Sequence, residues 1–392
     1  MRRDVLQPNR ASRVIVGAVL TALLALTLPQ SHAQSTAAPI PTDPSLKVAF
    51  IGDSGNGADF RRVLELIKSE GARVVLHQGD FDYADSAGAF FATIDSVLGR
   101  DFPYFASVGN HDVESWREGC SDSRMQRLLR SLSRRGAGCY AKFLKTRMAR
   151  IGVTPDDPDL DDQMYSVTYR GLKMVFVGEG GARAGNTLYA PYIQDQLASD
   201  DHIWRICSWH KNQNAMQVGD KDDAMGWRVY ETCKDLGAII ATAHEHSYHR
   251  TKTLTSIQNQ IVDASCSSPD NLCVGSGSPG RSFVFVSGLG GESIRSHQRC
   301  LPSTFPYGCN GEWAKIYTSD QGATFGALFI TFNIDGDPRK AQGYFKNING
   351  EIIDTFEIRA NAFSSLTAAR RPPAALLLSQ AKLQRDRHSR QD

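Results

Sequence analysis

Five short motifs contain side chains that can bind metal ions, and each follows an apolar run typical of a β-strand. Carboxylate, amide and imidazole groups together suit hard to borderline cations. The motifs are GDSG at 52–55, GDFDY at 79–83, GNHD at 109–112, WHKN at 209–212 and AHEHS at 243–247. The candidate ligands that they contain are Asp53, Asp80, Tyr83, Asn110, His210, His244 and His246.

The position of these motifs at strand ends predicts that they meet in space. In an α/β sheet the carboxyl ends of parallel strands open onto one edge, where side chains from separate strands converge. Each motif alone is a weak signal, but five in this order predict one metal site. Two cations about 3.5–4 Å apart can bind a phosphoryl group between them, and these motifs supply enough ligands for both. His77, His202 and His249 are predicted to be ordinary polar residues.

Tyr83 is the least expected member of the set, because a turn needs no phenol three residues after Asp80. A phenol with a pKa near 10 loses its proton readily only beside a strongly Lewis-acidic cation. The spacing therefore favours Fe(III) at the site that Tyr83 joins. The alternative is a tyrosine hydroxyl that simply closes a turn.

The elements that must position these motifs follow an α/β order, with strands and helices alternating early and strands enriched later. One helix is predicted over 58–71, with four apolar residues on a single face, and another passes through Phe90, Ile94 and Leu98. Strands are predicted at 46–52, 73–79, 102–109, 164–171, 173–178, 203–209, 238–243, 282–288, 326–334, 341–347 and 354–360.

Residues 1–33 are predicted to be a signal peptide, because a charged start precedes a short apolar run and a small-residue cleavage site ending at Ala33. We expect a secreted or periplasmic protein with no stable membrane span after cleavage; the alternative is an uncleaved anchor. All eight cysteines lie in the exported part, so up to four disulfides are expected. The simplest pairing joins sequence neighbours: Cys120–Cys139, Cys207–Cys233, Cys266–Cys273 and Cys300–Cys309.

The remaining organisation comprises a leader at 34–45, a catalytic domain at 46–360 and a basic tail at 361–392 predicted to be disordered. Without the signal peptide and the tail the chain is acidic, which is not a nucleic-acid-binding composition. The domain contains a basic helical insert at 114–162, ending in the aspartate-rich run DDPDLDD, and disulfide-clipped loops at 251–325. A substrate lid and a calcium loop are alternatives for the insert, but a solvated helix balanced by the acidic run is favoured.

The five motifs resemble the calcineurin-like metallophosphoesterases, and among them the short, single-domain purple acid phosphatases. They match that family's GDxG, GDxxY, GNH(D/E), xxxH and GHxH series, with Ala243 where a glycine is usual. The resemblance covers roughly 46–360. It implies an α/β fold, an αββα sandwich of two mixed sheets flanked by helices.

The resemblance also implies two metal sites. Asp53, Tyr83 and His246 would bind the first ion, expected to be Fe(III), and Asp80 would bridge both. The second ion, expected to be Zn(II), Mn(II) or Fe(II), would take the remaining ligands, which are Asn110, His210 and His244.

The reaction implied is hydrolysis of small phosphate monoesters by in-line attack of a metal-bound hydroxide. His111 would stabilise the phosphate or protonate the leaving oxygen, with Asp112 or Asp82 orienting it. The chain lacks the further histidine that larger acid phosphatases carry, so Lys211 or Asn212 would contact the phosphate instead. Alternatives are a phosphodiesterase or nucleotidase on the same scaffold, a non-catalytic phosphate- or metal-binding protein, and an anchored surface protein.

Overall fold

The computed structural model describes residues 39–117, 139–156, 163–179 and 186–361, all within one compact unit. The predicted signal peptide, Cys120, most of the acidic run and the tail beyond Asn361 lie outside the described residues.

The first large sheet has seven strands in the order β11-β16-β15-β14-β1-β2-β3. β1, β2 and β3 are parallel, whereas β14, β15 and β16 form an antiparallel meander that joins β1 through β14. Helical connections after β1 and β2 allow the parallel pairing. The strands are β1 (Leu46–Ile51), β2 (Val74–His77), β3 (Tyr104–Ala106), β11 (Asn271–Val274), β14 (Gly326–Ile334), β15 (Asp337–Asn347) and β16 (Ile352–Ala360).

The second large sheet also has seven strands, in the order β13-β8-β12-β7-β6-β5-β4. Its four central strands are parallel, and β4, β8 and β13 are antiparallel to their neighbours. The strands are β4 (Tyr165–Tyr169), β5 (Leu172–Phe176), β6 (Trp204–Ser208), β7 (Ile239–Thr242), β8 (Tyr248–Thr251), β12 (Val284–Ser287) and β13 (Trp313–Tyr317).

The two sheets pack face to face through aromatic side chains. Phe50 and Phe285 meet edge to face at 5.1 Å between ring centroids, and Tyr248 stacks on Phe345 at 4.3 Å. Such pairs bury large apolar areas and fix the relative position of the sheets. The core therefore lies between the sheets. Strands β2, β3, β5, β6, β7 and β12 are entirely buried, whereas β15 and β16 combine buried and more exposed residues.

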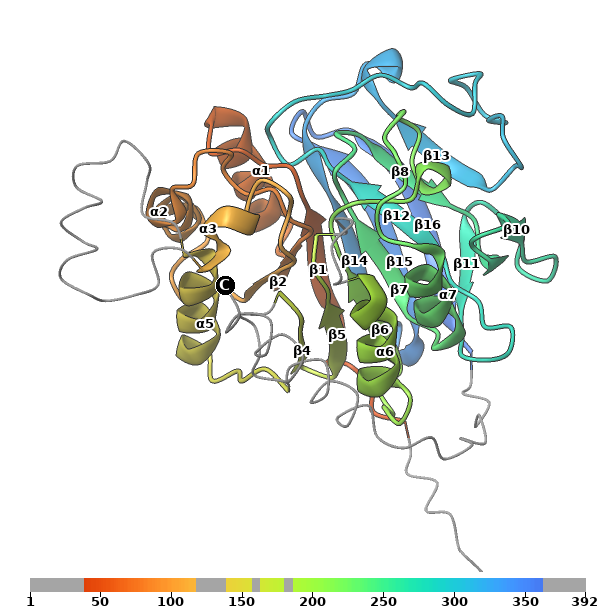
Figure 1. The fold of residues 1–392 in the computed structure, drawn as a ribbon, viewed down its shortest axis with the longest axis horizontal. Helices are drawn as coiled ribbons and strands as arrows, with labels where there is room; N and C mark the ends of the chain where they lie inside the picture. Colours follow the sequence, from red (N-terminus) through yellow and green to blue (C-terminus); the bar gives the residue numbers. More distant parts are fainter. Residues whose placement is uncertain (1–38, 118–138, 157–162, 180–185, 362–392) are drawn as a thin grey trace, which may run out of the picture. The chain divides into compact units, whose positions relative to one another are not determined.

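Helices cover the outer faces of both sheets (Figure 1). α1 buries Phe60, Val63, Leu64 and Ile67, the face that the sequence predicts. α6 and α7 bury a separate apolar cluster on the second sheet. The predicted αββα sandwich is confirmed. The helices are α1 (Ala58–Ser69), α2 (Ala87–Val97), α3 (Val113–Arg117), α5 (Tyr140–Arg150), α6 (Asn186–Leu197) and α7 (Trp227–Asp235).

The segment 251–281 lies within the disulfide-clipped loops predicted at 251–325, and it contains three short strands that were not predicted. β9 (Leu254–Ser256) pairs with β10 (Ile261–Val262), and β11 joins the edge of the first sheet beside β16. These strands have two to four residues, too few for an alternating pattern to stand out. β8 and β13 were missed for a similar reason, because polar residues such as His249 and Lys315 interrupt their apolar pattern.

Three of the four predicted disulfides are confirmed: Cys207–Cys233, Cys266–Cys273 and Cys300–Cys309. Cys139 is also disulfide-bonded, and its predicted partner lies outside the described residues. Cys207 and Cys233 join β6 to α7 across a buried interface.

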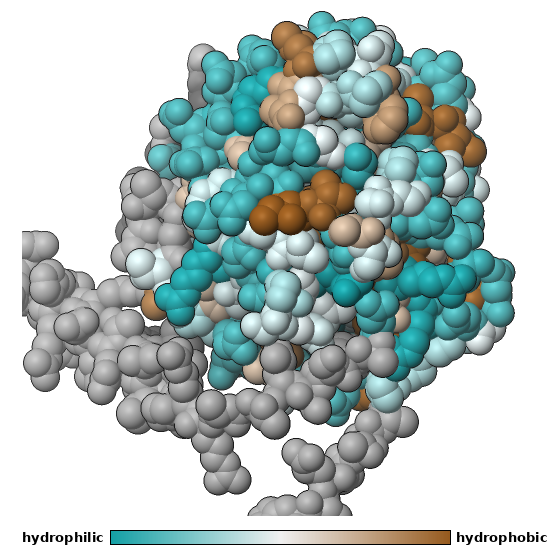
Figure 2. Space-filling view, turned by 90° about the vertical axis from the view of Figure 1, so that its right-hand side faces the viewer, coloured by the Kyte–Doolittle hydropathy of each residue, from teal (hydrophilic) through white to brown (hydrophobic). Residues whose placement is uncertain are grey.

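The molecular face shown in Figure 2 is mostly hydrophilic, with apolar side chains in separate groups. Scattered apolar residues of this kind are normal on a protein surface. Within the described ranges, no helix combines the length and apolar character needed to cross a bilayer.

Candidate metal centre

All five motifs lie at the carboxyl ends of strands, three in the first sheet and two in the second. Asp53, Asp80, Tyr83 and His244 have left-handed backbone conformations, with φ between 53° and 71°. Such conformations are costly for residues other than glycine and persist where surrounding contacts hold them. Here the N–H of His244 donates to Oδ2 of Asp53 at 2.8 Å, which ties two of the turns together.

Two glycines allow the motifs after β2 and β3 to touch. A Cβ atom on Gly109 would lie 2.0 Å from the backbone nitrogen of Asp80, and one on Gly79 would lie 2.6 Å from the nitrogen of Gly109. No side chain fits in either place. The glycines of GDFDY and GNHD are therefore needed to bring Asp80 and Asn110 to one site.

The second predicted ion site contains a close cluster of Asp80, His210 and His244. Nε2 of His210 lies 3.1 Å from Oδ2 of Asp80 and 3.1 Å from Nδ1 of His244. Nδ1 of His210 donates to the carbonyl oxygen of Gln78 at 2.8 Å, which leaves the Nε2 lone pair for a cation. The donor atoms of all three residues lie within 4.8 Å of one another, as metal ligands require.

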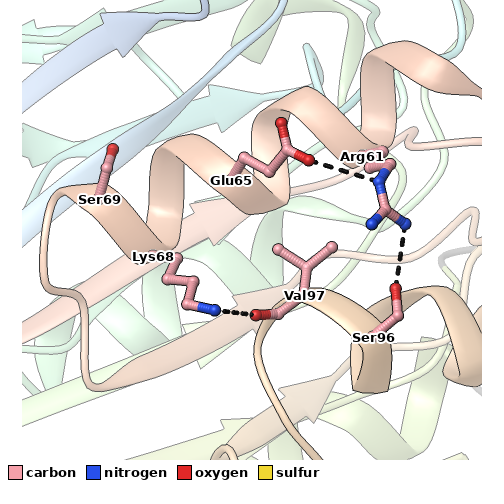
Figure 3. Close-up of a pocket in the computed structure, with 6 residues that line it drawn as sticks. All are labelled: Arg61, Glu65, Lys68, Ser69, Ser96 and Val97. Atoms are coloured by element: carbon pink, nitrogen blue, oxygen red, sulfur yellow. Dashed lines mark hydrogen bonds and ion pairs between the residues drawn. The ribbon is translucent and has the colours of Figure 1, made fainter.

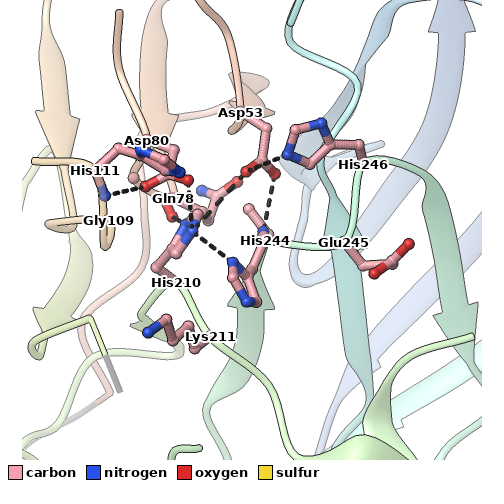
Figure 4. A network of polar contacts seen from close by, with 12 residues as sticks. Asp53, Gln78, Asp80, Gly109, His111, His210, Lys211, His244, Glu245 and His246 are labelled. Carbon is pink, nitrogen blue, oxygen red and sulfur yellow. Dashed lines mark hydrogen bonds and ion pairs between the residues drawn. The ribbon is translucent and has the colours of Figure 1, made fainter. Parts of the chain in front are cut away.

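The first predicted ion site brings together Asp53, Tyr83 and His246, and Figure 4 shows Asp53 and His246 facing each other. The hydroxyl oxygen of Tyr83 lies 3.3 Å from Oδ1 of Asp53 and 3.3 Å from Nε2 of His246, and the last two atoms are 3.4 Å apart. Nε2 of His210 lies only 3.9 Å from Oδ1 of Asp53, so the two clusters adjoin. This arrangement allows one residue to bridge two ions.

Asn110 supplies a further test of whether a cation fits here. Its Oδ1 is buried and has no hydrogen-bond partner among the residues that the structure describes. Leaving a buried acceptor unpaired costs free energy, so such atoms usually have a function. An amide oxygen aimed at a cation explains the unpaired state, and the residues present fit a metal centre.

Burial and mutual charge shift the protonation of these groups. Burial raises the pKa of Asp53 to about 7, and it lowers the pKa of His246 to about 3. Burial also raises the pKa of Tyr83 far above its usual value, reinforced by the charges of Asp53 and Asp80. Burial alone would raise the pKa of Asp80, but the charge of His210 outweighs it and holds that pKa below the usual value. A bound cation would favour ionised carboxylates and phenol and neutral imidazoles.

His111 lies beside the centre and is exposed to solvent. Its ring centroid is 4.5 Å from that of Tyr83. The backbone N–H of His111 donates to Oδ1 of Asp80 at 2.9 Å. An exposed imidazole next to the predicted ligands can reach a bound substrate. Its catalytic role stays a prediction that this position supports.

Asp112 contacts the backbone of the motif loops. Its Oδ2 accepts hydrogen bonds from the N–H groups of Asp80 and Gly109, at 2.9 and 2.7 Å, and its Oδ1 accepts one from Phe81 at 2.9 Å. These contacts fasten the loop after β2 to the loop after β3. They support a positioning role for Asp112 in the loops, and its role in orienting the ring of His111 stays a prediction.

Asp82, the predicted alternative for orienting His111, is also engaged elsewhere. It accepts hydrogen bonds from the N–H groups of Ala84 and Ser86, at 3.0 and 2.9 Å, and from the hydroxyl of Tyr140. These contacts hold the start of α2 against α5.

Both residues predicted to contact phosphate have partners within the fold. Nζ of Lys211 forms an ion pair with Glu179 at 3.1 Å. Asn212 is buried, donating to the carbonyl of Ala243 at 2.7 Å and accepting from the hydroxyl of Tyr230 at 3.0 Å. These contacts argue against Asn212 as a substrate ligand, because breaking them would leave buried polar groups unpaired.

Sequence reasoning missed three residues that support the centre: Gln78, Ser293 and Lys221. The hydroxyl of Ser293 contacts Nδ1 of His246, and the ammonium of Lys221 donates to the carbonyl of His244. Neither lies in a motif, and their contacts with the ligand loop exist only in the folded chain. His77 is buried with both ring nitrogens bonded within the fold, consistent with its predicted ordinary role.

A surface hollow between α1 and α2 lies away from the motifs (Figure 3). Its charged side chains are already paired: Arg61 with Glu65 and Ser96, and Lys68 with the carbonyl of Val97 at 2.8 Å. This hollow therefore offers no free group for chemistry.

The converging motifs and the two-sheet fold define a metallophosphoesterase. The chain belongs to the calcineurin-like phosphoesterase family, whose model matches residues 46–248, a range that includes all seven predicted ligands. No curated protein sequence matches significantly.

Solved structures of similar fold include the purple acid phosphatase PPD1 from yellow lupin (Lupinus luteus) seeds. It is 18% identical with a TM-score of 0.54, and the match covers 82% of this chain and 55% of that chain. The chain thus spans about half the length of the lupin protein. Another is PhoD, 10% identical with a TM-score of 0.50, covering 91% of this chain and 79% of that chain. At these identities the likeness shows a shared fold.

Proposed function

We propose that this protein is a secreted dinuclear-metal phosphatase that hydrolyses small phosphate monoesters, similar to purple acid phosphatases, with a catalytic domain at 46–360. The observation that carries the proposal is the contact between two ligand clusters, with Nε2 of His210 close to both Asp80 and Asp53. The unpaired buried oxygen of Asn110 supports it, because a bound cation would give this acceptor a partner.

The ligands are assigned as the resemblance implies. Asp53, Tyr83 and His246 would hold the first ion, and a phenolate ligand from Tyr83 would favour Fe(III). Asp80 would contribute to both sites, and the second ion would be Zn(II), Mn(II) or Fe(II). Asn110, His210 and His244 would hold that second ion. When bound, the ions would supply Lewis acidity for a water molecule and charge neutralisation for the phosphoryl group.

The chain's own residues orient the ligands and move protons. The carbonyl of Gln78 keeps the proton of His210 on Nδ1, so that Nε2 faces the centre. The hydroxyl of Ser293 orients His246 in a similar way. His111, exposed beside Tyr83, is positioned to donate a proton to the leaving oxygen.

Secretion is supported by three disulfides in the described residues, because such bonds persist in oxidising compartments. Sequencing the N-terminus of protein recovered from the exporting host tests it. We expect a mature chain that begins at Gln34. A chain that begins at residue 1 in the recovered material would contradict cleavage.

Metal analysis and two ester substrates test the proposed activity. Purified protein is expected to contain two metal ions per chain and to cleave para-nitrophenyl phosphate faster than bis-para-nitrophenyl phosphate. Chelation should abolish both activities, and metal should restore them. A faster diester reaction would favour the phosphodiesterase alternative. Bound metal without turnover of either ester would leave a metal-binding protein.

A further inference from the structure

The loop between β6 and α7 holds Lys221 in a fixed position. The carbonyl oxygen of Lys221 accepts two side-chain amides, from Asn214 at 2.8 Å and from Gln217 at 3.0 Å. The backbone nitrogen of Asn214 in turn donates to Asp223 at 2.7 Å. Because these bonds cross the loop from both sides of Lys221, its backbone has little freedom.

This loop presses against the segment that carries His244 and His246. A Cβ atom on Gly219 would lie 2.4 Å from the carboxylate of Glu245, so a larger residue would force that side chain to move. Nζ of Lys221 donates to the carbonyl oxygen of His244 and lies 3.8 Å from Oε2 of Glu245. The side chain of Lys221 keeps 17% of its surface exposed. A cation thus sits beside the predicted ligands and can still be reached from solvent.

The carboxylate of Glu245 does not pair completely with the ammonium of Lys221. The carboxylate is buried, and its Oε2 has no hydrogen-bond partner among the described residues. Its charge also acts on a second cation, exposed Arg295, whose backbone N–H donates to the carbonyl of His246 at 2.9 Å. Two cations, Lys221 and Arg295, therefore act on one buried carboxylate on this side of the centre. In Figure 4, Glu245 and His111 lie at opposite ends of the network.

We propose that Lys221 binds the phosphoryl oxygens of the substrate on the side of the centre opposite His111, and that it favours phosphate monoesters over diesters. This inference rests on the proposed phosphatase function. The chain has no histidine between Lys211 and Ala243, and Lys221 supplies a cation from that same segment. A monoester carries close to two negative charges at pH 7 and a diester only one, so an ammonium gains more from the monoester.

The test compares Lys221→Gln with wild type by calorimetric binding of inorganic phosphate to the metal-loaded protein, and by kcat/KM for the two nitrophenyl esters. We expect phosphate affinity and monoester kcat/KM to fall about 10- to 100-fold, with a diester change below about threefold. Metal content should stay at the wild-type value. Lys252→Gln is the control, because Lys252 also donates to a backbone carbonyl but lies at the far end of β8.

A purely structural role for Lys221, neutralising Glu245, gives different results. With that role, Lys221→Gln would either bind phosphate as tightly as the wild type, or lose metal and show the same fall in kcat/KM for both esters. Either result would overturn the proposal. Glu245→Gln provides a second arm should Lys221→Gln fail to fold: freeing the ammonium should preserve or tighten phosphate binding. Weaker phosphate binding in Glu245→Gln with metal retained would also overturn it. If the wild type binds phosphate but hydrolyses neither ester, the proposed function is rejected. The role of Lys221 is still tested, by comparing phosphate affinity between Lys221→Gln and the wild type.

Discussion

The carbonyl oxygen of Gln78 lies 2.8 Å from Nδ1 of His210. A carbonyl only accepts hydrogen bonds, so this contact places a ring proton on Nδ1 and leaves Nε2, which lies 3.1 Å from Oδ2 of Asp80, as the atom that can bind a cation. Gln78 immediately precedes Gly79, so the strand that presents Asp80 also orients the histidine of a different sheet. One backbone atom thereby couples the two halves of the centre.

Replacing that imidazole should empty the second ion site. We expect His210→Asn to retain about one metal ion per chain and to lose at least about 100-fold in phosphatase activity, because a ligand and its orientation are both removed. Elemental analysis beside a monoester assay measures this. His202→Asn is the matched control, since His202 pairs with Asp200 outside the centre and should keep both ions. Two ions retained by His210→Asn would contradict the ligand assignment.

Asp112 should matter chiefly for stability. Removing its carboxylate leaves three buried backbone N–H groups without an acceptor, so Asp112→Ala should lower the free energy of unfolding by about 3 kcal/mol. Urea denaturation measures the loss, and Asp112→Asn, which keeps one acceptor oxygen, should lose less. The opposite pattern, full stability with an altered pH–rate profile, would restore the predicted role of orienting His111.

A buried ion pair between the sheets should make stability depend on pH. Asp354 accepts from Nε of Arg250 at 2.8 Å, from Nη2 at 3.0 Å, and from the hydroxyl of Tyr248 at 2.7 Å. Burial alone would raise the pKa of Asp354, but Arg250 outweighs it and holds that pKa below the usual 3.8. The stabilisation is therefore complete above the unfolded pKa and declines as pH falls through the folded pKa.

Asp354→Asn tests this pair. We expect a loss of about 3 kcal/mol at pH 7, because Arg250 is left buried without its counter-charge. The difference from wild type should shrink below pH ~4, as Asp354 itself becomes protonated. Urea titrations at several pH values provide the measurement. Asp335→Asn, in an exposed pair with Lys340, should change stability by less than about 1 kcal/mol at every pH. If the loss of stability in Asp354→Asn became larger as the pH fell, the predicted direction of the pH dependence would be wrong.

Tyr83 should determine the colour of the protein. If its phenolate binds Fe(III), the wild type will show a visible tyrosinate-to-iron charge-transfer band that Tyr83→Phe lacks. Tyr169→Phe, far from the motifs at the end of β4, should keep the band. Visible spectra with iron analysis measure this. An active wild type that is colourless and free of iron would remove the Fe(III) assignment and leave the hydrolase standing.

The sequence alone was enough to predict the elements that carry the motif residues. The predicted strands before Asp53, Asp80, Asn110, His210 and His244 all formed, because each is a short segment rich in apolar residues. The α1 face was equally readable, since Phe60 and its apolar neighbours recur with helical period. Such patterns are local, so they can be recognised without knowledge of the fold.

The groups that support the centre could be identified only in the folded chain. The carbonyl of Gln78 meets His210 across 132 residues, and Ser293 meets His246 across 47. Lys221 reaches His244 because Gly219 lets its loop approach Glu245. β11 exists as a strand because β16 offers it a free sheet edge. These contacts depend on how separate elements pair and pack. Pairing between distant segments produces no periodic pattern of residues in the sequence of either segment.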